Sequence, residues 1–167
     1  MRKFKTMLAA LIGAFAMFLA APASAQLRVD VNQGHLNPMP IAVVDFLGSN
    51  AAAQQVGRDV AGVIRANLDS SGLFRPIAPN AFIERISSLD VPPRFPDWRI
   101  IDAQALAVGE VTPLPDGRVR IEFRLWDVLA QSSLTGFQYT TTPDNWRRIA
   151  HRISDQIYQQ LTGESGY

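Results

Sequence analysis

The feature that most restricts the fold of this chain is a nine-residue run, Arg118–Trp126, in which every odd-numbered residue is apolar. A repeat of two residues predicts a β-strand with one face turned to a core. The sequence Pro115-Asp116-Gly117 just before the run predicts a tight turn. Apolar residues 105–111 and the stretch 133–142 supply a strand on either side. The chain is therefore predicted to contain a β-meander of three strands.

Two segments have the helical repeat instead, with apolar residues three and four positions apart. The first is 51–71, followed by Gly72 as a left-handed cap. The second is 143–162, with Thr142 as its N-cap and Pro143 in its first turn. The apolar stripes are Ala53, Val56, Val60, Ile64 and Leu68 in the first helix, and Trp146, Ile149, Ala150, Ile153, Ile157 and Leu161 in the second.

Shorter segments complete the expected order of elements. Residues 41–46 are predicted to form a strand buried on both faces, and residues 73–77 an edge strand, because of Pro76. A short helix is expected at 81–88 and one more helical turn at 96–101. The predicted class is α/β (α+β): a single mixed sheet of about five strands, packed against two long helices on one face, with a mobile N-terminal strand.

The first 25 residues have the three parts of a secretory signal peptide. A basic start, with Arg2, Lys3 and Lys5, precedes a 14-residue apolar run, and small residues end the segment before Gln26. Fourteen helical residues cover about 21 Å, which is short of a hydrocarbon core of ~30 Å. We expect cleavage before Gln26 and no membrane insertion afterwards. In a Gram-negative cell the product would lie in the periplasm.

The remaining residues, 26–167, exclude several kinds of chemistry. They carry 13 arginines and no lysine against 15 acidic residues, so a broad basic surface for nucleic acid is not expected. The chain has no cysteine and two histidines, which excludes disulfides, thiolate metal sites and cysteine nucleophiles. No phosphate-binding loop, metalloprotease motif or serine-hydrolase elbow is present. We expect no cofactor and no catalytic residue.

Three groups of residues can be weighed as sites against a structural role. His151 and Asp155 stand four apart on the last helix and form the best acid–base pair, but a surface polar pair is the simpler interpretation. Asp45 and Asp102 flank strands, where carboxylates either catalyse or cap turns. One further set could bind an anion or form the solvated face of a strand: Arg118, Arg120 and Arg124, around Glu122. Trp98, Trp126 and Trp146 are expected to be packing residues.

The segment that follows the predicted cleavage point is the strongest candidate site. Leu27, Val29 and Val31 alternate with polar residues and precede a linker that contains Gly34 and two prolines. Such a strand could add to the edge of its own sheet, or it could detach and pair with the sheet of another protein. Both states are compatible with the sequence.

Five runs, in order and spacing, resemble the N-terminal domain of the TolB family, periplasmic proteins of the Tol–Pal envelope system. The runs are 41–46, 71–74, 107–111, 146–151 and 161–163. The resemblance covers essentially all of residues 26–167. Members of this family pair the α/β domain with a C-terminal six-bladed β-propeller that binds the lipoprotein Pal. The chain stops just after Gly163, so it is expected to be a fragment or a truncated product without the propeller, which puts Pal binding in doubt.

The resemblance also implies a partner for the N-terminal segment. In the family this segment binds the C-terminal domain of TolA, and the system maintains the outer membrane and helps it to constrict at division. By position, the TolA-binding residues would be Gln26, Leu27, Arg28, Val29, Asp30, Val31, Asn32, Gln33 and Gly34. Residues 35–167 would form the α/β domain. The alternative from the residues alone is a free-standing periplasmic domain that binds a ligand or the envelope through its arginine-rich strand.

Overall fold

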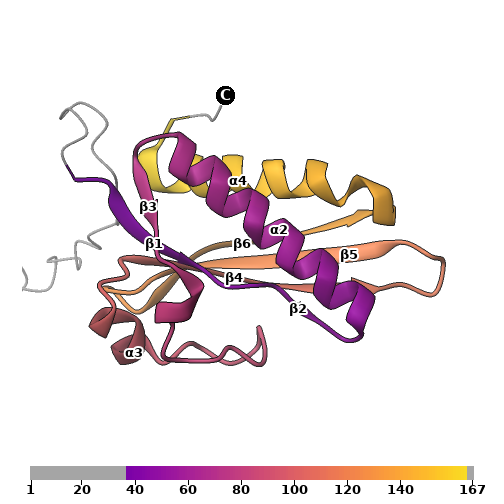
Figure 1. Ribbon diagram of the computed structural model, residues 1–167, viewed down its shortest axis with the longest axis horizontal. Helices are drawn as coiled ribbons and strands as arrows, with labels where there is room; N and C mark the ends of the chain where they lie inside the picture. The colour runs from indigo at the N-terminus through magenta and orange to yellow at the C-terminus, as the bar shows by residue number, and fades with distance from the viewer. Residues whose placement is uncertain (1–36, 165–167) are drawn as a thin grey trace, which may run out of the picture.

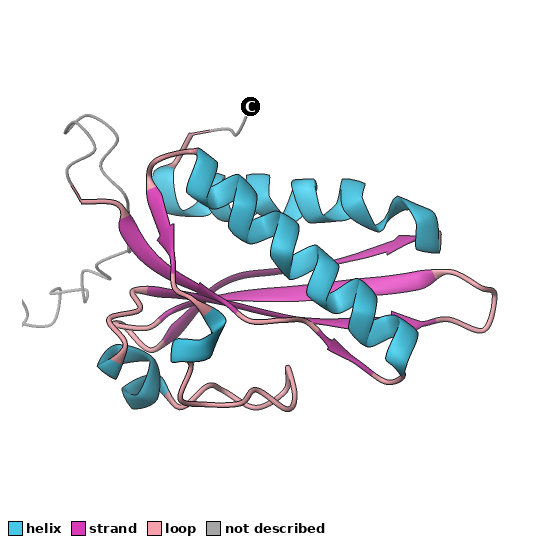
Figure 2. Ribbon diagram, in the orientation of Figure 1, coloured by secondary structure: helices cyan, strands magenta, loops and turns pink. Residues whose placement is uncertain are grey.

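The computed structural model describes residues 37–164, which form one β-sheet with two long helices on one face (Figures 1 and 2). The strands are β1 (Met39–Val43), β2 (Leu47–Gly48), β3 (Phe74–Pro76), β4 (Ala105–Pro113), β5 (Val119–Asp127) and β6 (Ser132–Thr141). The helices are α2 (Ala51–Ser70), η2 (Pro79–Ala81), α3 (Phe95–Ile100), η3 (Pro143–Asn145) and α4 (Trp146–Thr162). The predicted class, a mixed sheet packed against two long helices, is confirmed.

The sheet is mixed because its two halves are connected differently. The strand order is β3-β1-β4-β5-β6, and the short β2 pairs with β4 beyond the end of β1. Both β3 and β4 run parallel to β1, whereas β4, β5 and β6 form the predicted antiparallel meander. Gly117, in the turn between β4 and β5, has φ +82°, a conformation that glycine adopts without strain. As Pro76 predicted, β3 lies at an edge of the sheet.

The single strand expected at 41–46 is wrong, because the chain bends after Val43 and pairs again at Leu47. Phe46 holds the bend in place. Its N–H donates to the carbonyl oxygen of Gly57 in α2 at 3.3 Å, and its side chain is only 2% exposed. A Cβ atom built on Gly109 would lie 2.3 Å from the Phe46 ring, so the ring fills the space that this glycine leaves on β4.

The main core lies between the sheet and the two long helices. The apolar stripes predicted for α2 and α4 face the odd-numbered residues of β5, and Val60, Ile64, Ile153 and Ile157 are fully buried there. Asn50 begins α2 by accepting a hydrogen bond from the N–H of Ala53 at 2.9 Å. Gly72, with φ +70°, follows the C-cap of α2, as predicted.

A second, smaller core covers part of the opposite face. The segment 77–104, with α3, packs below the sheet in the view of Figure 1 against Ala42, Leu106, Val108 and Trp126. The short helix expected at 81–88 is wrong, since only η2 is helical and the residues after Ala81 are irregular. Three polar contacts replace it, all on the carboxylate of Glu84.

Glu84 holds this irregular segment in place. Its Oε2 accepts hydrogen bonds from Trp98 Nε1 at 2.6 Å and from the backbone N–H of Arg94 at 2.8 Å, and its Oε1 lies 3.6 Å from Arg94 Nε. Trp98 itself is completely buried. Within residues 37–164, no helix has the length and apolar character needed to cross a membrane.

Candidate functional site

The predicted partner-binding residues, from Gln26 to Gly34, lie outside the described part of the chain. The structure does show where that segment joins the fold. The N–H of Met39, the first residue of β1, donates to the carbonyl oxygen of Leu73 at 2.9 Å. In Figure 1 the start of β1 and the end of α4 lie at the same end of the molecule. The described part of the chain therefore begins in the parallel half of the sheet.

The arginine-rich strand does not form an open anion site. Arg118 donates to Asp116 Oδ2 at 2.7 Å, and these hydrogen bonds lower the pKa of the Asp116 carboxyl and raise the pKa of the Arg118 guanidinium. Arg120 Nε lies 2.9 Å from Glu122 Oε2. Both charges of each pair stand at the surface. The solvated-face interpretation of this strand is the one that the geometry favours.

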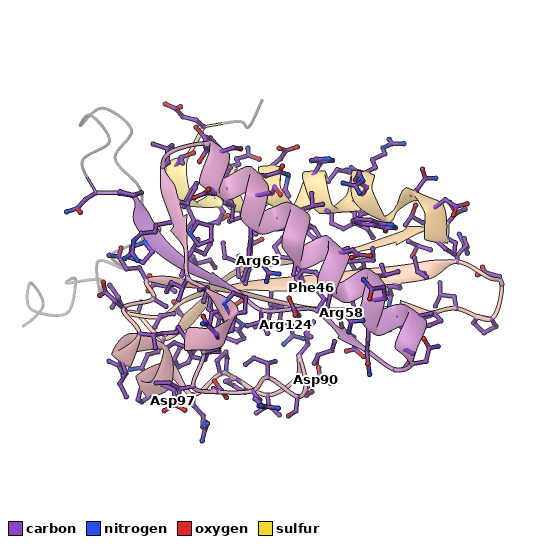
Figure 3. All side chains as sticks on the ribbon, viewed as in Figure 1. Phe46, Arg58, Arg65, Asp90, Asp97 and Arg124 are labelled. Atoms are coloured by element: carbon purple, nitrogen blue, oxygen red, sulfur yellow. The ribbon has the colours of Figure 1, made fainter. Side chains whose placement is uncertain are left out.

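Arg124, the third arginine of that strand, crosses to the irregular segment below the sheet. Its Nη1 donates to the carbonyl oxygen of Leu89 at 2.7 Å, and its Nη2 lies 3.5 Å from Asp90 Oδ1. Figure 3 shows both labelled residues, Arg124 and Asp90, on the side of the sheet away from the helices. Arg124 thus fastens the segment 77–104 to β5.

The acid–base pair considered on the last helix is not assembled as a catalytic group. His151 Nδ1 lies 2.9 Å from Asn67 Nδ2, so the imidazole bridges α4 to α2. Ser154, three residues further on, donates its hydroxyl proton to the Ala150 carbonyl at 3.0 Å and accepts from Asn67. No hydrogen bond joins His151 to Asp155 or to a hydroxyl in the part of the chain that the structure describes. A polar helix–helix contact is the role that these distances support.

Asp45 and Asp102 are separated in the fold. Asp45 accepts hydrogen bonds from both terminal nitrogens of Arg65 at 3.0 Å, and Arg65 also donates to the Val43 carbonyl at 2.8 Å, so this carboxylate ties the end of β1 to α2 rather than capping a turn. The Asp102 side chain is 86% exposed and lies 3.9 Å from Arg75. Among residues 37–164, no three histidine or acidic side chains gather as metal ligands.

A hollow of about 360 Å³ opens beside Asp45, between β2, the first turns of α2 and Ser87. Asp45 and Glu110 contribute negative charges to its wall and Arg58 a positive one. Phe46 also lines it, and Figure 3 labels this residue next to Arg58 and Arg65 under α2. The opposed charges favour no single class of ligand for this hollow.

The outer edge of β6 was not predicted from the sequence. Phe137 stacks between Phe123 and Tyr139, with ring centroids 6.1 and 6.5 Å apart, yet its side chain is 45% exposed. The guanidinium of Arg152, in α4, lies 5.2 Å from the centre of the Tyr139 ring. A signal was present in the sequence, because residues 132–141 contain no charged side chain.

The fold and these contacts define a class: a mixed α/β domain whose polar side chains hold its elements together and whose last strand, β6, has an unpaired outer edge in the described part of the chain. Comparison with known proteins makes this specific. The model of the TolB amino-terminal domain family matches residues 27–134, and the chain belongs to this family. The Tol-Pal system protein TolB of Paramagnetospirillum magneticum is 46% identical over 162 residues, which is 93% of this chain and 36% of that protein.

Solved structures agree with the fold. The crystal structure of TolB from Acinetobacter baumannii has a TM-score of 0.64 at 23% identity and covers 84% of this chain and 32% of that one. The hypothetical protein CT253 from Chlamydia trachomatis has a TM-score of 0.53 at 11% identity over 77% of this chain and 100% of that one. At these identities the likeness concerns the fold alone. The chain spans about a third of the length of the TolB proteins that it matches.

Proposed function

We propose that this protein is a non-enzymatic periplasmic component of the Tol–Pal system that binds the C-terminal domain of TolA through residues 26–34. The observation that carries the proposal is membership of the TolB amino-terminal domain family, with a match that begins at residue 27, inside that segment. The alternation of Leu27, Val29 and Val31 suits an added strand, whose backbone hydrogen bonds supply affinity. Through this contact the protein supports outer-membrane integrity and constriction at division.

The site geometry is consistent with a binding role. In the described residues, two of the side chains that were weighed as catalytic already have structural partners: Asp45 is paired with Arg65, and His151 contacts Asn67 across the two long helices. The free-standing domain that binds a ligand through its arginines has less support, because Arg118, Arg120 and Arg124 each have an acidic partner. Pal binding is not proposed. In the family, Pal binds to the C-terminal propeller, and this chain matches only about a third of the length of its relatives.

Deletion of residues 26–34 tests the proposal. We expect titration with the purified TolA C-terminal domain to show binding for the unaltered chain and none for the deletion, while the circular dichroism spectrum and melting temperature stay the same. Val29→Pro, which removes one backbone donor, should weaken binding. Arg85→Ala, a surface change in the irregular segment, is the matched control and should bind normally. Undiminished binding by the deletion variant would reject the proposed role of the segment.

A further inference from the structure

Within residues 37–164, the strand β6 forms an unusually unprotected edge of the sheet. It is ten residues long, forms the end of the strand order, and contains no proline and no charged residue. Edge strands of soluble proteins are normally short, charged or interrupted, because their free N–H and C=O groups attract other strands. The one interruption here is a bulge opposite Leu125/Trp126, which leaves Thr135–Thr141 regularly paired to β5. Alternate residues of that stretch direct their backbone groups outward.

Both faces of this edge offer a place for the side chains of an added strand. On the helix side, the exposed ring of Phe137 continues the aromatic stack toward Tyr139. On the opposite side, a hollow of about 240 Å³ is lined by Arg124, Gly136 and Gln138, among others. Gly136 presents no side chain to this hollow, and a Cβ on it would lie 3.2 Å from the Phe123 carbonyl oxygen and 3.4 Å from Arg124 Cγ. Strand addition takes specificity from such pockets for alternate side chains.

The charge next to the edge selects the chemistry of the partner. Arg152 lies over Tyr139, and Arg148 stands one helical turn earlier, on the same face of α4. Neither arginine has an ion pair among residues 37–164. Asp155 also faces Tyr139, where its charge opposes that of Arg152 in setting the pKa of the phenol. The three side chains together leave one net positive charge beside the edge.

We propose that the outer edge of β6, over Thr135–Thr141, is a docking site for an extended strand of another protein that carries acidic side chains on the face turned to α4. Main-chain pairing continues the sheet, Phe137 contacts an apolar side chain of the partner, and Arg148 and Arg152 pair with its carboxylates. A second copy of this chain suits the edge less well. Pairing of two β6 strands about a two-fold axis would bring both sets of Arg148 and Arg152 together.

The test uses the purified full chain and two labelled eleven-residue peptides. In the acidic probe, every second residue is threonine, and the positions between are valine and glutamate in turn. In the basic probe, lysine replaces each glutamate. We expect the acidic probe to raise the fluorescence anisotropy, to shift the amide resonances of residues 135–141, and to bind roughly tenfold more tightly than the basic probe. Phe137→Ala, which removes the apolar contact without adding a charge, should weaken its binding by about fivefold.

Charge reversal on α4 supplies the matched control. The pair Arg148→Glu and Arg152→Glu should abolish the preference for the acidic probe, whereas Arg147→Glu should preserve it, because the Arg147 guanidinium lies over the Trp146 ring and not over Tyr139. Equal affinity for the two probes, or unshifted β6 amides at about millimolar peptide, would overturn the proposal. A dimer that dissociates on Phe137→Lys would also overturn it, because a second copy would then occupy the edge. So would β6 amide resonances that shift when residues 26–34 are deleted, because the chain's own N-terminal segment would then occupy the edge.

Discussion

Phe46 shows how one residue sets the distance between a helix and the sheet. Its carbonyl oxygen would lie 2.2 Å from a Cβ at Gly57, and its ring 2.3 Å from a Cβ at Gly109. The carbonyl is backbone, which cannot move aside without breaking the path from β1 to β2. Glycine is therefore needed at position 57 because the Phe46 backbone comes so close to α2, and not because of an unusual φ angle.

Gly57→Ala is expected to lower the free energy of unfolding by roughly 1–3 kcal/mol, as overpacked sites do. Gly62→Ala is the control on the same helix. A Cβ at Gly62 would meet no atom within 4 Å, so this change should raise the stability by about 0.5–1 kcal/mol through helix propensity. Urea unfolding midpoints measure both. Equal effects of the two substitutions would show that the close approach of Phe46 to Gly57 does not limit stability.

Tyr139 offers a second test at the scale of single residues. Burial raises the pKa of its phenol above the usual 10.0, the positive charge of Arg152 lowers it, and the negative charge of Asp155 raises it. Because a cation favours the phenolate, Arg152→Gln should raise the pKa of Tyr139 further. Tyrosine ring resonances followed against pH would report the change. Arg147→Gln should leave this titration unaltered, and a fall in the pKa on loss of Arg152 would refute the assignment.

The irregular segment 77–104 is a cover for the second face of the sheet, and Glu84 is its main polar fastening. Glu84→Ala leaves the buried N–H of Trp98 and the N–H of Arg94 without this acceptor, so we expect a loss of about 1–3 kcal/mol. Glu84→Gln retains one acceptor oxygen and should lose less. Chemical denaturation compares the two variants. The same loss for both would indicate that the charge, and not the acceptor, stabilises the segment.

Elements with a long hydrophobic period were predictable from the sequence. The stripes of α2 and α4 and the alternation of β5 each repeat over several turns or pairs, so their local pattern already specifies the buried face. Residues 81–88 show where a local pattern is not enough. Phe82, Ile83 and Ile86 have helical spacing, but a distant partner, Trp98, decides the local structure through Glu84.

The candidate site was predictable to a smaller degree. The sequence pattern correctly placed the three arginines of β5 together. It did not reveal where their acidic partners lie: in the preceding turn for Arg118, in the same strand for Arg120, and for Arg124 at Asp90, 34 positions away. The edge position of β6 follows from the strand order, which no single segment reveals. The segment 26–34 stays a prediction.

At the scale of the whole molecule, the two cores share one sheet. Ile41 and Val43 face the main core, while Ala42, between them, faces the second core. Loss of either core therefore exposes the same strands, and we expect all described elements to unfold together. Trp98 and Trp126 lie in the second core and Trp146 packs against the main core, so in a Trp146→Phe variant the fluorescence reports the second core, whereas the far-ultraviolet signal comes largely from α2 and α4. Fluorescence and circular dichroism should give coincident transitions, and an earlier fluorescence transition would show that the second core unfolds separately.

The position of β1 has a mechanical consequence. This strand begins at the end of the molecule from which residues before Met39 leave, and it lies between β3 and β4, parallel to both. Tension on the preceding chain, directed along the strand, loads the hydrogen bonds on its two flanks in shear. Under shear, these hydrogen bonds must break together and not one after another. β1 therefore resists a pull better than an edge strand, whose hydrogen bonds would open in sequence.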